Sequence, residues 1–128
     1  LLLYPALDAG MDSDSYREYA SGYYLSAELM QRCWQAYLGD PGAPPALASP
    51  AHATDLHGLA PASVLSCEHD PLRDEAEQYA LRLQAAGIDC TLERLPGMVH
   101  ACIHLHTVSA STDVAVQRAG ALLRQALC

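Results

Sequence analysis

Strand-like apolar runs alternate with helical stretches along the chain, and this order constrains the fold more than any other feature. Continuous apolar runs at residues 1–6 and 62–67 are typical of strands buried on both faces of a parallel sheet. Residues 88–95 alternate apolar and polar side chains, which indicates a half-exposed strand at a sheet edge. With the three helices between and after these runs, the order predicts an α/β fold of three parallel strands with crossover helices.

The predicted helices span residues 26–38, 74–86 and 112–127. Ser26 is placed to cap the first helix and Gly39 to close it. Its apolar stripe consists of Met30, Cys33, Trp34 and Tyr37, and the last helix is expected to bury Ala115, Ala119, Leu122 and Ala126. Residues 8–22 and 40–61 are rich in turn-forming residues, so loops are expected there.

Composition bounds the domain count and the class of partner. A chain of 128 residues with 51% hydrophobic residues fits one globular domain, residues 1–128. The net charge of −8 argues against nucleic acid or an anionic membrane as partner, and no apolar run is long enough to span a bilayer. The five cysteines are dispersed, so we expect small buried hydrophobes in a reducing, cytoplasmic compartment.

The first residues, 1–4, resemble a strand already under way, without an initiator methionine or a cap. We therefore expect the chain to be the C-terminal part of a longer protein, that is, one partial domain. Cut off from neighbouring strands, the apolar edge at Leu1–Tyr4 is expected to invite self-association, including a homo-oligomer.

Two acid/base residues follow consecutive predicted strands. Asp70 comes after the strand at residues 62–67, and His100 comes after a Pro-Gly turn that is expected to end the next strand. Because the carboxyl ends of parallel strands meet at one sheet edge, the two turns should lie side by side. The carboxylate would then fix the imidazole tautomer and leave the other ring nitrogen free to take a proton.

Both residues also have a structural interpretation. Asp70 before Pro71 is a good helix N-cap, and a lone histidine after a turn is often a surface residue. Asp74 with Glu77 three residues later would make a better capping box, which would leave the Asp70 carboxylate free.

A metal site competes for the same region. The pattern His100-x-Cys102-x-His104-x-His106 places four ligand-type side chains on one side of a strand, or as two i,i+4 pairs on a helix. Either geometry could hold zinc or copper, so a small metal-binding module is an alternative function.

Four segments together resemble a known enzyme family. They are Leu-Leu-Tyr-Pro at residues 2–5, Asp-Pro-Leu-Arg-Asp-Glu at 70–75, Tyr-Ala-x-x-Leu-x-x-Ala-Gly at 79–87 and Pro-Gly-Met-x-His at 96–100. The chain resembles the C-terminal part of the α/β-hydrolase fold-3 family, the hormone-sensitive-lipase-like (bacterial family IV) carboxylesterases. The resemblance implies a serine carboxylesterase that hydrolyses short-chain carboxylic esters, small-molecule substrates, without metal or organic cofactor.

The resemblance also assigns roles to residues. Asp70 would be the acid and His100 the base of a Ser-Asp-His triad, with Leu72, Met98 and Val99 near the acyl pocket. The family's Gly-x-Ser-x-Gly elbow and His-Gly-Gly-Gly loop do not occur in this chain, so this chain alone is expected to be inactive. The family usually continues His-Gly-Phe, whereas this chain continues through Ala101 and Cys102. A non-catalytic derivative of the hydrolase fold is the remaining alternative.

Overall fold

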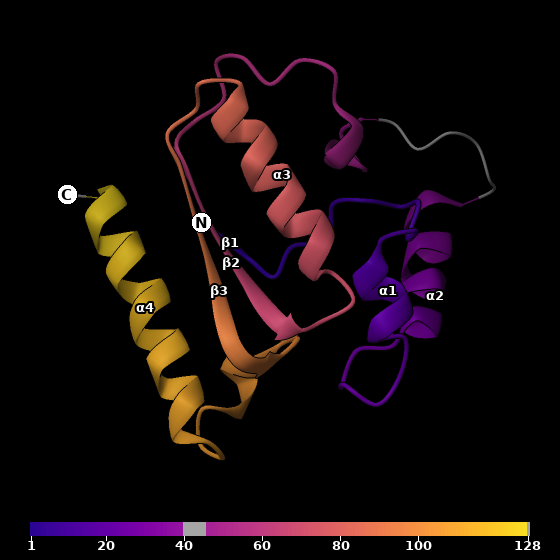
Figure 1. Cartoon of the computed structure of the whole chain (residues 1–128), viewed down its shortest axis with the longest axis vertical. Helices are drawn as coiled ribbons and strands as arrows, with labels where there is room; N and C mark the ends of the chain where they lie inside the picture. Colours follow the sequence, from indigo (N-terminus) through magenta and orange to yellow (C-terminus); the bar gives the residue numbers. More distant parts are fainter. Residues whose placement is uncertain (40–45, 128) are drawn as a thin grey trace.

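The computed structural model describes residues 1–39 and 46–127. The strands β1 (Leu2–Leu3), β2 (Ala62–His69) and β3 (Cys90–Val99) form a parallel sheet in the order β1-β2-β3. The helices are α1 (Asp14–Glu18), α2 (Ala27–Leu38), α3 (Arg73–Ala85) and α4 (Ala110–Leu127), with short 3₁₀ turns η1 (Pro50–His52) and η2 (Cys102–Leu105). Figure 1 shows the arrangement and confirms the prediction of three parallel strands with helices between them.

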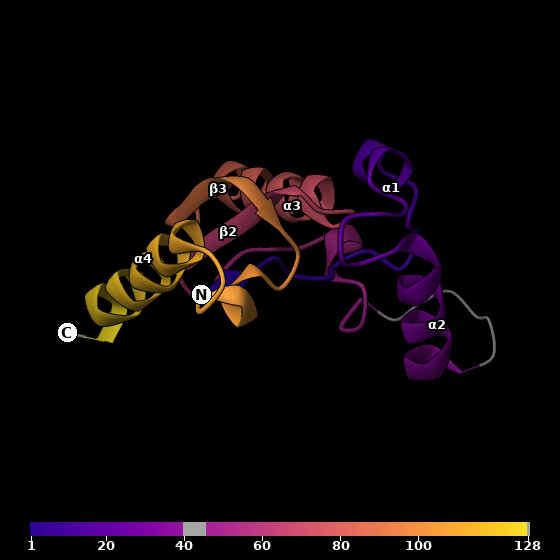
Figure 2. The ribbon, with the colours of Figure 1, turned by 90° about the horizontal axis from the view of Figure 1, so that it is seen from below.

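The two long C-terminal helices cover opposite faces of the sheet (Figures 1 and 2). Side chains alternate along β2, so Val64 packs with Ala76 and Ala80 of α3, whereas Leu65 and Cys67 pack toward α4. The central strand is therefore buried on both sides, as its continuous apolar run predicts.

Strand β1 is much shorter than the run at residues 1–6 predicts. Only Leu2 and Leu3 pair with β2, opposite Val64 and Leu65. Tyr4 then adopts a positive φ of 36°, and Pro5 lacks an N–H for further ladder bonding. The backbone turns away from the sheet at Tyr4, which ends the strand.

Strand β3 is longer than predicted, because it continues through Pro96 and Gly97 to Val99. The register against β2 shifts between the pairs Cys67–Leu95 and His69–Val99, so β3 holds two more residues than β2 in this interval. Gly97 has a φ of 70°, and its N–H donates to Glu68 Oε2 at 2.6 Å. The Pro-Gly pair thus forms a bulge within the strand and does not terminate it.

The loop predicted at residues 8–22 contains the short helix α1. Ser15 in this helix is fully buried and bonds to the start of α3, a tertiary contact that local turn signals do not report. The predicted start of α2 is confirmed, since the Leu29 N–H donates to Ser26 Oγ. Met30 is buried and Trp34 is half-buried, as the predicted apolar stripe of α2 requires. Cys33 and Tyr37 are exposed, so the prediction is wrong for these two residues.

The remaining predictions differ from the structure in detail. Helix α3 begins at Arg73 after Leu72, so the proposed Asp74–Glu77 capping box does not form. In α4, Ala115, Ala119 and Leu122 are buried as expected, while Ala126 is exposed. Of the loop predicted at residues 40–61, residues 40–45 lie outside the described residues. Within the described part of the chain, no helix combines the length and apolar character that crossing a membrane requires.

Candidate active site

Asp70 lies directly after the carboxyl end of β2, in the turn that leads into α3. Its side chain is 1% exposed, and each oxygen has a separate partner. Oδ1 accepts the Leu72 N–H at 2.9 Å, while the backbone carbonyl accepts the Arg73 N–H at 3.1 Å. Asp70 therefore serves the turn before α3 and still presents Oδ2 to the sheet edge. The N-cap of α3 is Leu72, so the interpretation of Asp70 as the helix cap is wrong, and its catalytic role stays a prediction.

His100 follows β3, the neighbouring strand, and reaches the second oxygen of Asp70. Its Nδ1 lies 2.9 Å from Asp70 Oδ2, and its side chain is 21% exposed. An ionised carboxylate only accepts hydrogen bonds, so Nδ1 carries the proton and donates it. The Nε2 atom is then the basic nitrogen of the ring. The predicted juxtaposition of positions 70 and 100 is present in the structure.

Tyr4, directly after β1, packs against the His100 ring at the same edge of the sheet. Its ring packs edge-on against the His100 ring, with centroids 4.7 Å apart and an interplanar angle of 64°. The Tyr4 N–H donates to the Leu65 carbonyl at 2.7 Å, which holds the residue at the end of β1 despite its positive φ. Burial is the largest cause that raises the pKa of the Tyr4 phenol, and the electrostatic effects of Cys102, Cys67 and Asp70 act in the same direction, so the phenol stays neutral.

The Asp70 turn is braced by helix α1. The Ser15 Oγ hydroxyl donates to the Pro71 carbonyl at 2.6 Å, and the Ser15 N–H donates to Asp74 Oδ2 at 2.8 Å. Arg73 bonds Asp74 through Nε at 2.8 Å and the Tyr19 hydroxyl through Nη1 at 3.1 Å. Asp74 is thus engaged by α1 and Arg73, which explains why it does not cap α3.

Glu75 is a buried acid for which the sequence predicts no role. Its Oε1 accepts the Leu7 N–H at 2.6 Å and the Asp8 N–H at 3.2 Å, which fastens the segment after β1 to α3. Its Oε2 is buried without a hydrogen-bond partner among the described residues. Burial raises the pKa of the Glu75 carboxyl to about 7, although the two backbone N–H groups act in the opposite direction. The one indication in the sequence that Glu75 has a special role is its place at the end of the Asp-Pro-Leu-Arg-Asp-Glu segment, residues 70–75.

The three residues predicted near an acyl pocket lie in different surroundings. Leu72 is buried in a cluster with Tyr16, Leu25 and Met30 on the side of α1 and α2. Met98 is half-buried and packs against the cluster beneath α4, and Val99 pairs with His69 in the sheet. The structure therefore places Leu72 in one apolar cluster and Met98 in another.

The four residues of the possible metal site do not converge. His100 bonds Asp70, and the Cys102 sulfur lies against Cys67, while His104 and His106 are exposed. Within residues 1–39 and 46–127, no three His, Cys, Asp or Glu side chains are grouped so that they could hold a metal ion.

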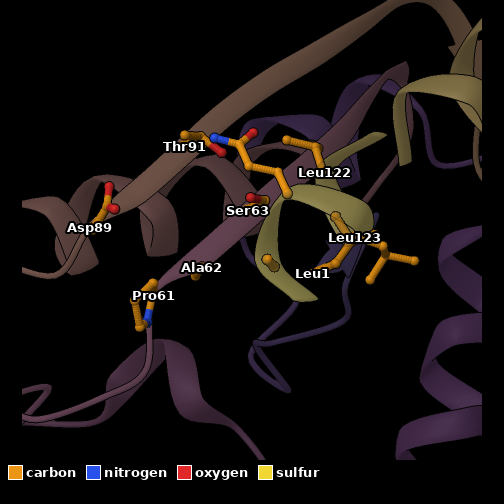
Figure 3. Close-up of a pocket in the computed structure, with 10 residues that line it drawn as sticks. Leu1, Pro61, Ala62, Ser63, Asp89, Thr91, Leu122 and Leu123 are labelled. Carbon is orange, nitrogen blue, oxygen red and sulfur yellow. The ribbon is translucent and has the colours of Figure 1, made fainter. Parts of the chain in front are cut away.

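A cavity of about 220 Å³ lies at the opposite end of the sheet (Figure 3). Figure 3 shows Ser63 and Thr91, at the starts of β2 and β3, beside Leu122 and Leu123 of α4. Asp70 and His100 follow the other ends of these strands, roughly 20 Å away at 3.3 Å per residue. This cavity is therefore separate from the acid–base pair.

Comparison with known proteins places this geometry in context. The family model described as alpha/beta hydrolase fold matches residues 1–104. Carboxylesterase NlhH of Mycobacterium tuberculosis is 34% identical over 132 residues, which cover 99% of this chain and 41% of that protein. Ethyl acetate hydrolase of Pseudomonas putida is 32% identical over 119 residues, which cover 88% of this chain and 36% of that protein.

The chain is also similar to solved structures of esterases. A thermostable esterase from Pseudomonas putida ECU1011 superposes with a TM-score of 0.87 at 38% identity, over 92% of this chain and 39% of that one. The chain thus spans about two fifths of the length of the proteins that it matches.

Proposed function

The chain belongs to the alpha/beta hydrolase family, and from this premise we propose that it supplies the acid and the base of a serine carboxylesterase. The observation that carries the proposal is the 2.9 Å contact between His100 Nδ1 and the buried Asp70 Oδ2. The substrates of the whole protein are short-chain carboxylic esters, small molecules that need neither a metal nor an organic cofactor for hydrolysis. A receptor-type derivative of the fold would need neither residue in this contact.

The pair performs two proton transfers in each half of the reaction. Nε2 of His100 accepts the proton of a serine hydroxyl supplied by the rest of the protein, while the serine oxygen attacks the ester carbonyl carbon. His100 then returns the proton to the leaving alcohol, and an acyl-serine remains. Water repeats the sequence, attacking the acyl carbon as it gives its proton to Nε2, and the carboxylic acid is released as the serine regains its proton.

Asp70 orients the imidazole and stabilises its charged form. Because the carboxylate is buried, its interaction with the imidazolium is weakly screened by water. The Leu72 N–H holds Oδ1, so the carboxylate cannot rotate freely away from His100. This arrangement selects the tautomer that leaves Nε2 as the base.

We assign the acyl side of the site to Leu72, Met98 and Val99. Leu72 is two residues from Asp70, and Val99 and Met98 immediately precede His100, so each residue is tied to one member of the pair. Because Leu72 and Met98 belong to different apolar clusters, they would bound the acyl group from different sides. Their apolar side chains suit a moderately apolar acyl group.

The proposal extends to assembly and compartment. Leu1 is exposed, and β1 pairs with β2 on one side, so residues 1–4 offer an edge for self-association or for a neighbouring strand of the whole protein. The acidic composition, with no lysine, is consistent with a cytoplasmic enzyme that does not bind nucleic acid.

The proposal is tested by pairing this chain with the N-terminal half of a related esterase and measuring hydrolysis of p-nitrophenyl esters. His100→Ala should lower kcat by about 10⁶-fold, because the general base is lost. Asp70→Asn should lower kcat by about 10⁴-fold, because the correct tautomer is lost. His104→Ala is the matched control, since this exposed histidine lies four residues further on and should leave the rate unchanged. Activity that survives His100→Ala would refute the assigned role.

A second measurement does not depend on reconstituted activity. In this chain, the Nδ1–H proton of His100 should give a low-field NMR signal because it is held against a carboxylate. The signal should disappear in Asp70→Ala. A spectrum without that signal in the folded parent chain would contradict the proposed contact.

A further inference from the structure

Two buried cysteines lie side by side next to the acid–base pair. The sulfur atoms of Cys67 and Cys102 are 3.8 Å apart, and both residues are almost completely buried in the cluster between the sheet and α4. Cys67 precedes Asp70 by three residues, and Cys102 follows His100 by two. The segment between the two sulfurs therefore contains both members of the pair.

The two thiols are chemically unequal. Either sulfur can donate the hydrogen bond between Cys67 and Cys102. With Cys67 as the donor, this bond is the largest cause that lowers the pKa of Cys102, against the effect of burial. Backbone N–H groups at Ile103 and Cys102 and the neighbouring His100 imidazole act in the same direction. The same hydrogen bond, followed by burial, raises the pKa of Cys67. Cys102 is thus the thiolate-forming partner and Cys67 the proton-bearing one.

We propose that Cys67 and Cys102 are a reversible disulfide site, whose oxidation closes residues 67–102 into a covalent loop around Asp70 and His100. The Cys102 thiolate attacks hydrogen peroxide, breaks its O–O bond, and becomes a sulfenic acid as hydroxide leaves and is protonated to water. The sulfur of Cys67 then attacks the Cys102 sulfur and loses its proton, and the sulfenic oxygen leaves as a second water. Two thiols lose two electrons, and one peroxide gains them.

The two sulfur atoms must move closer together before a disulfide can form, and the elements that carry them differ in how easily they can move. A disulfide needs about 2 Å between sulfur atoms, so the present separation must close by less than 2 Å. Cys67 is fixed in the central strand, whereas Cys102 begins the short turn η2 after Ala101, whose φ is 58°. The closing movement therefore belongs to η2. Because both sulfurs are buried, peroxide must enter during transient opening of this turn.

The other cysteines of the described residues are placed away from this pair. Cys33 is exposed on α2, and Cys90 lies in the cluster on the α3 face of the sheet. Cys128 lies outside the described residues. The predicted burial of the cysteines is confirmed for Cys67, Cys90 and Cys102 and is wrong for Cys33, which is exposed.

The test uses the full chain with Cys33, Cys90 and Cys128 changed to serine, so that positions 67 and 102 hold the remaining thiols. After peroxide treatment of the folded protein, titration in denaturant should find both thiols lost, and the intact mass should fall by two hydrogens. Dithiothreitol should restore both thiols. The oxidised chain should unfold at a higher urea concentration than the reduced chain, because the closed loop restricts the unfolded state.

Cys67→Ala and Cys102→Ala in the same background are the controls, and neither should show the mass loss or the shift in the urea midpoint. Two variants are used so that a folding defect in one does not decide the result. Thiols that stay titratable at peroxide concentrations that oxidise Cys33 in the parent chain would overturn the proposal. A covalent dimer in place of the internal loop would overturn it as well. The outcome is independent of esterase activity.

Discussion

The turn that carries Asp70 and the turn that carries His100 are held by different kinds of contact. Around Asp70, backbone and side-chain hydrogen bonds from Leu72, Ser15 and Asp74 fix the path from β2 into α3. Among the described residues, the His100 ring is placed by one hydrogen bond to Asp70 and by the edge of the Tyr4 ring. The acid is fixed by a polar network, while the base is placed by the acid and by packing.

The difference implies that substitutions in the two turns should have different consequences. Changes to the polar network should lower the free energy of unfolding, since they leave buried groups without partners. Changes beside His100 should alter the position of the imidazole with little loss of stability, because a half-exposed side chain contributes less burial.

The largest effect should come from Glu75, as a dependence of stability on pH. Its folded pKa of about 7 lies above the unfolded value of 4.5, so its contribution is fully present below pH 4.5 and is lost as pH rises to about 7. The loss should be on the order of 3 kcal/mol. Glu75→Gln stays neutral and keeps an oxygen for Leu7, so urea unfolding at several pH values should show this component removed.

Glu77→Gln is the matched control for that experiment. Hydrogen bonds from Arg94 and Ser66 outweigh burial and lower the pKa of Glu77, so its stabilising contribution is lost as pH falls. The two variants should therefore change the pH dependence in opposite directions. Equal pH profiles for Glu75→Gln and the parent chain would show that Glu75 does not titrate as described.

A smaller effect is expected at Asp70 itself. Asp70→Ala leaves the buried Leu72 N–H without a partner and should lower the free energy of unfolding by about 2–3 kcal/mol. Asp70→Asn retains an oxygen for this N–H and should cost about 1 kcal/mol or less. Urea denaturation of the two variants measures the difference. Equal losses in both would mean that the bond to Leu72 does not stabilise the turn.

The smallest effect on stability is expected at Tyr4, whose ring packs against His100 in the second of the two turns. Tyr4→Ala removes the ring from His100 and should cost about 1 kcal/mol beyond the loss of burial. Tyr4→Phe retains the ring and is the control, with stability and the low-field His100 signal unchanged. A Tyr4→Ala variant with the His100 signal unmoved would show that the ring does not help to place the imidazole.

The sheet and the acid–base pair could be predicted because their signals are local. The apolar run of β2 and the turn residues after it place Asp70 at a strand end, and the same reasoning applies to β3 and His100. Parallel pairing of neighbouring strands then brings two side chains 30 residues apart into contact. The cap of α2 at Ser26 is equally local.

The errors have a common physical cause, which is competition from distant partners. Asp74 has the sequence of a helix cap, but Ser15, 59 residues earlier, takes its carboxylate. Glu75 bonds Leu7, 68 residues away, so nothing next to it in the chain indicates its burial. Helix α1 forms where Ser15 meets these residues, and composition around it predicts a loop.

The bulge at Pro96–Gly97 has a consequence for how the chain tolerates length changes. Successive residues of a strand point to alternate sides, so an extra even number of residues in β3 preserves the side on which His100 emerges. Insertion or loss of a single residue between Leu95 and His100 would turn the imidazole away from Asp70, whereas removal of the Pro-Gly pair would shorten its reach but keep its direction. Among variants of this chain, the contact between His100 and Asp70 should therefore follow the parity of the residue count in this short interval.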